Sequence, residues 1–385
     1  MERVKKPFVK RWLEPIVFLC ILLGAGTALA IPMGLANMLN TLMNTAYSLL
    51  IDTAFYILAI AVLTGALSAL LSEFGVVDMF NRLLSPLMRP LYGLPGAASL
   101  GVVTTFLSDN PAILSLTEDR AFRGYFKDYQ LVALTNLGTS FGMGLIVMSF
   151  MLGLENVAGE SLLGAVMVGI LGAVLGSILS TRLMLLFSGR RLGKETPPAP
   201  LPPDSSGANT ENGEKPRLSM RIINAILNGG KTGVTLGLEI IPGVLIICTL
   251  VLMMTNGAPE GGVYTGAAKE GVGWLPYIAD KLDFMLRPLF GLQSAQGISV
   301  PITALGSAGA AMGLVPQLLT AKTANAHDVA VFTAMCMCWS GYLSTHVAMM
   351  RKLGHSELTG KAILSHTCGG LFAGICANWL FVLFF

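Results

Sequence analysis

The chain contains one eight-residue motif twice, and this repeat constrains its fold more than any other feature. Residues 87–94 read Leu-Met-Arg-Pro-Leu-Tyr-Gly-Leu, and residues 285–292 read Met-Leu-Arg-Pro-Leu-Phe-Gly-Leu. Each copy precedes an apolar segment, rich in small residues, that is interrupted near its middle. The interruption is Ser108-Asp109-Asn110-Pro111 in the first half and Gly306-Ser307-Ala308-Gly309 in the second, at the same offset from the motif. The sequence therefore predicts two related halves.

Composition places both halves in a membrane. The 385 residues are 53% hydrophobic and 12% charged, with a mean hydropathy of +0.68, whereas a soluble domain is about 25% charged. Because lipid offers no hydrogen bonds to the backbone, long apolar runs in it must be helical. The sequence predicts an all-α polytopic protein of the cytoplasmic membrane, with the lipid bilayer as its solvent. The net charge of +3 is too small to indicate a nucleic-acid partner.

Apolar runs of about 20 residues are long enough to span a bilayer. Two shorter, charged stretches, 79–93 and 275–292, carry the motif and are predicted to lie at the membrane interface. The interrupted segments, 96–118 and 294–320, are predicted to be re-entrant hairpins or discontinuous spans, and the sequence leaves both open. The predicted full spans are 13–31, 46–72, 129–153, 162–187, 232–254, 328–350 and 363–384.

A proline-rich, polar segment separates the halves. Its composition cannot bury a core, so residues 189–220 are predicted to form a disordered cytoplasmic linker. Residues 1–45 are then an N-terminal cytoplasmic segment with the first membrane helix. The first repeat covers 46–188 and the second covers 221–385.

Lysine and arginine gather in four segments, which the positive-inside rule places in the cytoplasm. They are the N-terminus, 120–127, the linker and 351–361. The segments 32–45 and 153–160 contain neither residue and are predicted to be outward-facing loops. With these ends fixed, equivalent helices of the two halves cross the membrane in opposite directions. The sequence therefore predicts inverted repeats, and the helix over 13–31 is the extra element that permits the inversion.

The repeated Arg-Pro-Leu-(Tyr/Phe)-Gly-Leu motif, followed by an interrupted apolar segment, resembles the Gate or nucleoside recognition domain family. That family includes spore-maturation-type membrane proteins, and similar domains occur in ferrous-iron permeases and concentrative nucleoside transporters. The resemblance covers about 55–188 and 235–384 and implies an inverted-repeat transporter or permease. The Asn-Glu-Phe-type motif that such nucleoside transporters use is absent, and so is a P-loop.

Residues at the two interruptions are candidate substrate ligands. A helix that restarts at Asn110-Pro111 presents free N–H groups, which attract a polar or anionic group, and glycine lets the backbone approach a ligand closely. The alternative is two kinks packed against neighbours. An ionisable residue inside an apolar segment, such as Asp109, indicates substrate binding or proton coupling unless it only caps the helix. The candidates are Ser108, Asp109, Asn110, Gly306 and Ser307.

Polar residues on two predicted spans are further candidates for substrate binding. Asn136 and Ser140 share a helical face. They and Ser340, in the counterpart helix, are predicted to line a cavity, or alternatively to hydrogen-bond across helices.

The same counterpart helix contains possible metal ligands. Cys336, Cys338 and His346 are residue types that bind soft metals. Side chains two positions apart on a helix, however, point about 200° apart. The cysteines are therefore interpreted as packing residues, and neither a metal site nor a cofactor is predicted.

Acidic residues also stand in the first long helix of each half. Asp52 and Glu239 are predicted to form ion pairs with Arg89 or Arg287, since burying either charge alone is expensive. The alternative is that they bind a coupling ion.

These observations predict a secondary transporter for a small polar or anionic metabolite, nucleoside-like or carboxylate. The substrate would bind between the two interrupted segments, with H⁺ or Na⁺ as the coupling ion. Two alternatives remain: a non-transporting membrane scaffold in envelope or spore maturation, and a metal-ion permease. No enzyme motif is present, so an enzyme is not predicted; a homo-oligomer stays open.

Overall fold

The computed structural model describes residues 8–198, 217–259 and 261–385. Within these ranges every regular element is a helix and no strand occurs, so the all-α prediction is confirmed. Most of the predicted linker, residues 199–216, lies outside the described residues.

The first half starts with three helices that follow one another almost without interruption. α1 (Phe8–Met33) leads to α2 (Leu35–Ser48), and the π-helical segment Leu49–Ala54 joins α2 to α3 (Phe55–Glu73). The remaining elements are α4 (Val76–Leu87), the π-helical segment Met88–Tyr92, α5 (Ala98–Leu107), α6 (Pro111–Glu118), α7 (Arg120–Arg123), α8 (Asp128–Thr139), α9 (Gly144–Leu152), α10 (Glu155–Ala158) and α11 (Leu163–Leu192).

The second half repeats this order: a long helix with a π-helical segment, two short helices at the motif, two broken helices and a long closing helix. Its elements are α12 (Leu218–Gly243), the π-helical segment Val244–Cys248, α13 (Thr249–Thr255), α14 (Trp274–Lys281), α15 (Asp283–Phe290), a 3-10 turn (Ala295–Ile298), α16 (Ser299–Ala304), α17 (Ala308–Thr320), α18 (Ala326–Cys338), α19 (Tyr342–Leu353), a 3-10 turn (Ser356–Leu358) and α20 (Thr359–Phe384).

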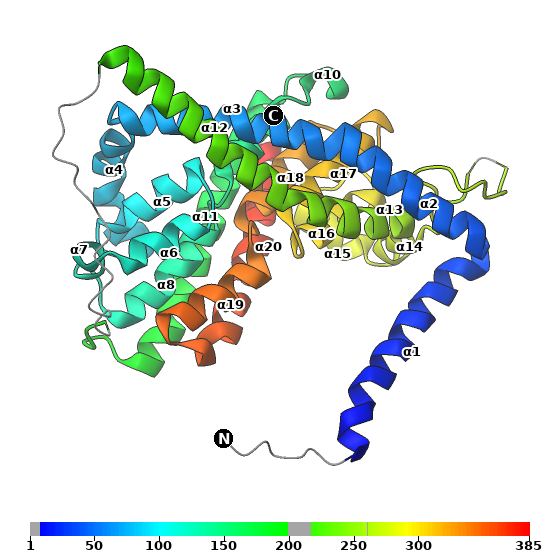
Figure 1. The fold of residues 1–385 in the computed structure, drawn as a ribbon, viewed down its shortest axis with the longest axis horizontal. Helices are drawn as coiled ribbons and strands as arrows, with labels where there is room; N and C mark the ends of the chain where they lie inside the picture. The colour runs from blue at the N-terminus through cyan, green and yellow to red at the C-terminus, as the bar shows by residue number, and fades with distance from the viewer. Residues whose placement is uncertain (1–7, 199–216, 260) are drawn as a thin grey trace.

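Glycine contacts show that the first helices of the two halves are antiparallel. A Cβ added at Gly65 would lie 2.5 Å from the carbonyl oxygen of Gly229, and one at Gly237 would lie 2.4 Å from Leu58. Residues with higher numbers on α12 therefore contact residues with lower numbers on α3. Figure 1 shows the two helices running in opposite directions. Gly229, Gly233 and Gly237 repeat every fourth position, the spacing that lets membrane helices approach closely.

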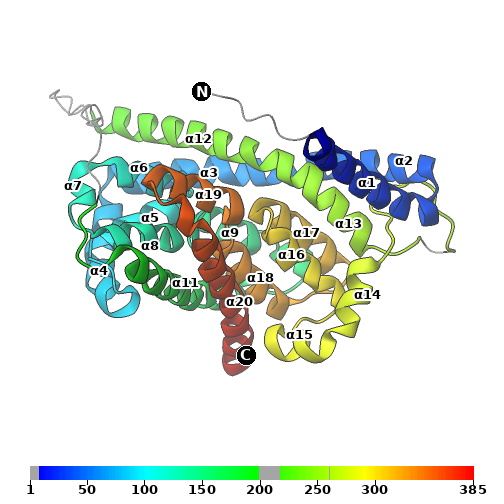
Figure 2. The same ribbon diagram turned by 90° about the horizontal axis from the view of Figure 1, so that it is seen from below.

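The closing helices are antiparallel too. A Cβ at Gly172 would lie 3.0 Å from Ala377, and one at Gly176 would lie 2.4 Å from the carbonyl oxygen of Gly369. Figure 2 shows α20 beside α11 in the middle of the molecule. Because equivalent helices run oppositely in both pairs, the predicted inverted repeats are confirmed.

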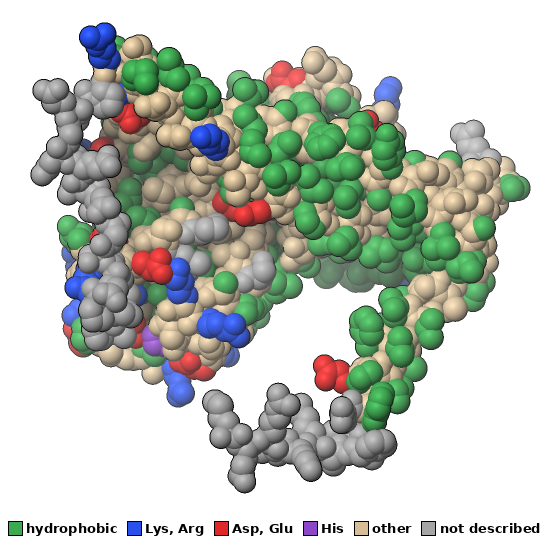
Figure 3. Space-filling view, viewed as in Figure 1, with side chains coloured by type: hydrophobic (Ala, Val, Ile, Leu, Met, Phe, Trp, Pro, Cys, Tyr) green, Lys and Arg blue, Asp and Glu red, His purple; other side chains and the backbone are tan. Residues whose placement is uncertain are grey.

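The surface of the molecule is that of a multi-pass membrane protein. In the described residues six helices are long and apolar enough to cross a bilayer. Only 6% of the most apolar window of α1 is buried, and side chains such as Phe18 and Ile21 are exposed. Figure 3 shows hydrophobic side chains covering α1 and the neighbouring part of the body, whereas charged side chains gather toward the opposite end.

Basic segments that are far apart in the sequence meet in space. His355 Nε2 lies 2.9 Å from a carboxylate oxygen of Asp128, and Lys127 Nζ lies 3.6 Å from Glu195. These pairs connect three of the four basic segments, in the regions of residues 120–128, 190–195 and 351–361.

Two sequence predictions were wrong. Residues 35–45 belong to α2 and are not a loop. The lack of lysine and arginine indicated an outward-facing loop, whereas in the structure Asn37 and Asn44 donate to the carbonyl oxygens of Tyr264 and Gly266, which lie in a loop of the second half. The spans predicted over 129–153 and 328–350 are not continuous, because each is interrupted near its middle.

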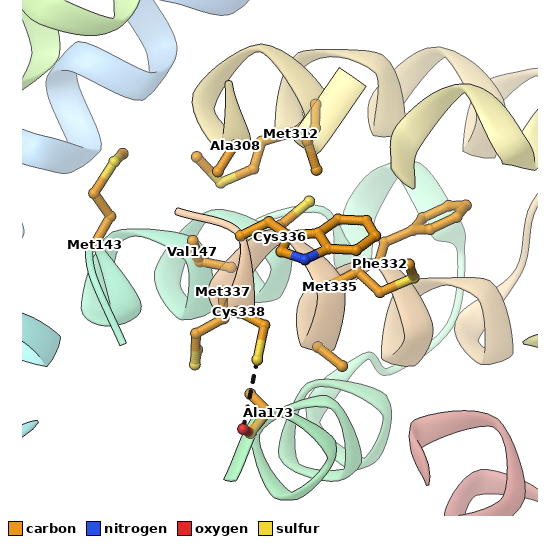
Figure 4. Packing of buried hydrophobic residues seen from close by; sticks show 14 of the residues in the cluster. Met143, Val147, Ala173, Ala308, Met312, Phe332, Met335, Cys336, Met337 and Cys338 are labelled. Carbon is orange, nitrogen blue, oxygen red and sulfur yellow. Dashed lines mark hydrogen bonds between the residues drawn. The ribbon is translucent and has the colours of Figure 1, made fainter. Parts of the chain in front are cut away.

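Small and sulfur-containing side chains fill the core where the halves meet. Figure 4 shows Val147 of the first half and Met312 of the second around Cys336 and Cys338. The Cys338 thiol donates to the carbonyl oxygen of Ala173 at 3.7 Å. The thiols thus pack or bond to the backbone, and the described residues contain no group of three His, Cys, Asp or Glu placed to hold a metal.

Candidate functional site

The interruption over residues 108–110, here the first break, separates two short helices. α5 ends at Leu107, and α6 restarts at Pro111, a residue that suits the first helical position. The half-buried Asp109 carboxylate accepts a hydrogen bond from the Asn110 N–H at 2.7 Å. Asn110 stands at the cap position, yet its side chain makes no capping bond. Its amide group is therefore available for contacts elsewhere.

The Asn110 side chain crosses to the other half of the molecule. It is 2% exposed, and its Nδ2 donates to the carbonyl oxygen of Ser340 at 3.1 Å. It fills space that two glycines leave open, since a Cβ at Gly142 or at Gly341 would lie 2.2 Å from one of its amide atoms. Asn110 therefore connects the first break with the interruptions in both neighbouring helices.

These interruptions are the third break, residues 140–143 between α8 and α9, and the fourth break, residues 339–341 between α18 and α19. Met143 has φ 56° and Gly341 has φ 65°, so the chain takes a left-handed conformation at both. Neither break could be predicted from the sequence, because both runs are apolar enough and long enough for a full span. The available signal was the glycines within them, such as Gly142 and Gly341.

Two polar atoms at this junction have no hydrogen bond. Asn110 Oδ1 and Ser340 Oγ are buried and find no partner among the described residues. Each such atom costs about 1–3 kcal/mol, and folded proteins satisfy nearly all of their buried polar groups. A ligand with an N–H or O–H group for Asn110 and a polar group for Ser340 would satisfy both.

The second break, residues 305–307 between α16 and α17, is built differently. Ser307 is the N-cap of α17, and its Oγ accepts a hydrogen bond from Ala310 N–H at 3.2 Å. A Cβ at Gly309 would lie 2.4 Å from Ile240, and one at Gly306 would lie 3.1 Å from an isoleucine of the adjacent π-helical segment. Gly309 and the Ser307 side chain thus pack against the first helix of their own half, whereas Gly306 is exposed.

The predicted cavity residues of α8 are engaged in helix–helix bonds. Asn136 Nδ2 donates to Ser180 Oγ at 3.1 Å and to the carbonyl oxygen of Ala362 at 3.0 Å. Ser140 Oγ donates to the Asn136 carbonyl at 2.8 Å, and both residues are fully buried. Of the two, only Ser140 reaches the junction, because it stands at the third break.

The predicted ion pairs of Asp52 or Glu239 with Arg89 or Arg287 are not found among the described residues. Arg287 lies 3.1 Å from Asp283, one helical turn earlier and therefore its nearest acidic partner. The Asp52 carboxylate accepts from a serine hydroxyl one turn before it, and Glu239 is exposed. Asp52 lies inside a π-helical segment whereas Glu239 precedes one, so the two acids are not at equivalent positions.

A cavity of about 320 Å³ lies between the α2–α3 junction, α9 and α17. Its lining includes the charged Asp52 and Lys269 and the polar Gln317. Lys269 is held there by a backbone turn with φ 67° and by its N–H, which donates to Thr45 Oγ1 at 2.8 Å. The next residue, Glu270, anchors this loop; burial would raise the pKa of its carboxyl, but hydrogen bonds from Thr265 and Gly266 lower it.

Comparison with known proteins agrees with the resemblance found in the sequence. Residues 54–179 match the family model of the Gate domain, described as nucleoside recognition. An uncharacterised protein of Alkalihalophilus pseudofirmus is 30% identical over 113 residues, which are 29% of this chain and 24% of that protein. The match thus spans about a quarter of this relative's length.

Solved structures of the concentrative nucleoside transporter CNTnw have the same fold. An inward-facing, substrate-bound structure gives a TM-score of 0.51 at 16% identity, with 86% of this chain and 75% of that chain covered. An outward-facing double variant gives 0.52 at 15% identity, with 98% and 88% covered. The chain therefore has a transporter fold of inverted repeats with discontinuous helices.

Proposed function

We propose that this chain, which carries the Gate domain over residues 54–179, is a secondary transporter for a small polar metabolite of the nucleoside class. The substrate would bind at the junction of the first, third and fourth breaks. One observation carries the proposal: Asn110 Oδ1 and Ser340 Oγ, which belong to opposite halves, are buried and have no hydrogen-bond partner within the described part of the chain.

The chemistry of these two atoms favours a neutral polar ligand. The amide oxygen of Asn110 accepts hydrogen bonds only, whereas the hydroxyl of Ser340 both donates and accepts. A nucleoside carries ribose hydroxyl groups and ring nitrogens of both kinds, so it can serve both atoms. The cavity of about 320 Å³ beside α17 is large enough to admit such a molecule, and its lining includes neither Asn110 nor Ser340.

The inverted repeats suggest how access would alternate. In folds of this type, one set of helices rocks against the other around a site at the repeat interface. The Asn110–Ser340 contact joins α6 of one half to the fourth break of the other. Rocking would open this contact on one side of the membrane and then on the other.

Coupling to H⁺ or Na⁺ is part of the proposal. Asp109 is half-buried beside the site and interacts electrostatically with Glu239 of α12. Asp52 lines the adjacent cavity. These three acids are the carboxylates we propose for Na⁺ binding, whereas Arg287, paired with Asp283, has a structural role.

We further propose that the protein lies in the cytoplasmic membrane, with its basic segments in the cytoplasm. The contacts His355–Asp128 and Lys127–Glu195 support a common side for three of these segments. Labelling of single cysteines placed at residue 125 and residue 385 would test the orientation. The proposal expects residue 125 to react from the cytoplasm and residue 385 from outside.

Uptake into proteoliposomes tests the function directly. The purified full chain would be assayed with radiolabelled nucleosides, nucleobases and small carboxylates, with and without H⁺ and Na⁺ gradients. Asn37→Ala is the matched control for Asn110→Ala, because Asn37 also donates to a carbonyl oxygen, at 2.9 Å, but far from the breaks. The proposal fails if no compound accumulates above empty vesicles, or if Asn110→Ala transports as well as Asn37→Ala.

A further inference from the structure

Two histidines lie together in the interior and have no part in the site described so far. The rings of His346 on α19 and His366 on α20 have centroids 4.7 Å apart. Both side chains are fully buried. Histidine is the side chain whose charge changes most readily near neutral pH, so such a pair in a membrane interior needs an explanation.

The hydrogen bonds of His346 leave one nitrogen open to a proton. Its Nδ1 lies 2.6 Å from the carbonyl oxygen of Tyr342; because a carbonyl only accepts, this nitrogen carries the hydrogen of the neutral ring. The bare Nε2 faces Thr139 Oγ1 at 3.4 Å, and that hydroxyl also donates to the carbonyl of Thr135 at 2.9 Å. A proton added to Nε2 would therefore find the Thr139 oxygen as its acceptor.

His366 is also incompletely bonded. Its Nδ1 lies 3.1 Å from Ser180 Oγ, which accepts a hydrogen bond from Asn136 Nδ2. Its Nε2 is buried and has no hydrogen-bond partner among the described residues, whichever tautomer the ring adopts. The pair thus contains an unpartnered polar atom of the kind that folded interiors normally avoid.

Few titratable groups face the pair. Tyr342 of α19 lies with its ring 6.4 Å from His346 and 5.9 Å from His366, centroid to centroid. At the end of α18 it is the backbone of Cys338 that approaches His366, while α8 and α11 contribute the neutral Thr139, Asn136 and Ser180. Since none of these is a carboxylate, an added positive charge would be compensated poorly in this closed arrangement and better by water.

The pair is connected to the proposed substrate site through one helix. α19 starts directly after the fourth break, where Ser340 meets Asn110, and His346 lies one turn beyond Tyr342. A movement that opens the fourth break would therefore also move His346 relative to Thr139 and His366 and admit water.

We propose that the His346–His366 pair binds the coupling proton of the transporter, an inference that rests on the function proposed above. When α19 moves and water reaches the pair, His346 Nε2 takes one proton from hydronium, which leaves as water, and the new N–H donates a hydrogen bond to Thr139 Oγ1. When the helices close to the arrangement described here, the proton returns to water on the other side. One proton is bound at a time, since two charged rings in contact repel each other.

Tryptophan fluorescence tests proton binding without any transport. Trp339 Nε1 donates to the carbonyl oxygen of His366 at 3.3 Å, and a protonated imidazole quenches a nearby indole. In nanodiscs, a protein with Trp12→Phe, Trp274→Phe and Trp379→Phe reports on Trp339 alone. A one-proton transition is expected below about pH 6.5, the ordinary midpoint of histidine, because the closed arrangement compensates the added charge poorly. A flat signal would overturn the proposal.

Variants assign the transition to the pair. His346→Gln and His366→Gln should abolish it, whereas His327→Gln, which alters a histidine bonded to Asn378, should keep it. Thr139→Val keeps the volume but removes the acceptor of the added proton, so the midpoint should fall by about 0.5–1 pH unit. Size-exclusion profiles identify any variant that fails to fold. If the histidine variants do not fold, the shift of the fluorescence midpoint in Thr139→Val tests the proposal. A transition that is unchanged in the folded variants of the pair or in Thr139→Val would overturn the proposal.

Vesicle experiments separate this inference from the proposed function. An inward proton gradient should raise substrate uptake by about tenfold or more in the unmodified protein and have no effect in His346→Gln. Uptake that does not depend on the proton gradient would refute proton binding by the pair, but it would still support the proposed transport function. A pair-dependent fluorescence transition without uptake of any compound would instead refute the transport function and leave a proton-binding site.

Discussion

The first and second breaks lie at the same offset from the repeated motif, yet their polar side chains make different contacts. In the first, Asn110 leaves the helix end uncapped and extends its amide to the Ser340 carbonyl of the other half. In the second, Ser307 caps α17 and stays within its own half. An inverted repeat can thus keep the same backbone arrangement in both copies while only one of these two breaks sends a side chain into the other half.

The difference lies in side-chain length and in the surrounding glycines. An asparagine at the first break reaches between Gly142 and Gly341, which have no side chains to exclude it. A serine at the second break is too short to leave its helix end, and Ile240 closes the space beside it. We therefore expect changes at the first break to affect transport and changes at the second to affect stability.

The largest effect is expected from Asn110→Ala. The change removes an unpartnered acceptor of the substrate and the bond to Ser340, together about 1.5–3 kcal/mol of substrate binding. Initial uptake rates at low substrate concentration should fall about 10- to 100-fold, measured in proteoliposomes. Equal loss in the Asn37→Ala control would show a general folding defect instead.

Gly341→Ala should displace Asn110 from its place between the breaks. The new Cβ would lie 2.2 Å from Asn110 Nδ2, at a backbone φ of 65°. Strain and displacement together should cost about 2 kcal/mol of stability, seen as a lower thermal midpoint, and uptake should fall as well. Gly354→Ala is the matched control, since it has φ 83° but open space around it. Uptake as low in Gly354→Ala would exclude displacement of Asn110 as the cause.

Ser307→Ala should affect stability alone. Loss of the N-cap bond to Ala310 costs about 1 kcal/mol, which thermal unfolding in detergent can measure, while the uptake rate should stay within about twofold of the unmodified protein. A strong loss of uptake without loss of stability would place a substrate ligand at the second break and remove the asymmetry.

The smallest effect on the empty protein is expected from Ser340→Ala. Because its hydroxyl has no hydrogen-bond partner in residues 8–198, 217–259 and 261–385, removing it should leave the thermal midpoint unchanged or slightly higher. Substrate should nevertheless stabilise the variant less than it stabilises the unmodified protein. An equal substrate-induced shift in both would show that Ser340 Oγ does not contact the ligand.

Much of the fold could be predicted from the sequence, because the motif, the charge bias and the apolar runs are all local signals. They indicated two inverted halves and an interruption at residues 108–111. The third and fourth breaks could not be predicted in the same way. Residues 129–153 and 328–350 are each apolar enough and long enough for a full span, and the glycines at their interruptions pack against Asn110, which is more than 30 residues away in the sequence.

The site was only partly predictable for a related reason. Asn110 and Asp109 were identified because polar residues in an apolar segment stand out. The free acceptor of Asn110 and the bonding of Asn136 to Ser180 and Ala362 depend on helix packing, which no periodicity encodes. The pairing of Arg287 with Asp283 followed the short-range spacing of a helix rather than the symmetry of the repeats.

Equilibrium binding tests the asymmetry of the two breaks most directly. The panel compound with the highest uptake would be titrated into the unmodified protein, Asn110→Ala and Ser307→Ala in nanodiscs. The account predicts equal affinity for the unmodified protein and Ser307→Ala, and a Kd at least about tenfold weaker for Asn110→Ala. Equal affinities in all three, or a weaker Kd in Ser307→Ala than in Asn110→Ala, would contradict it.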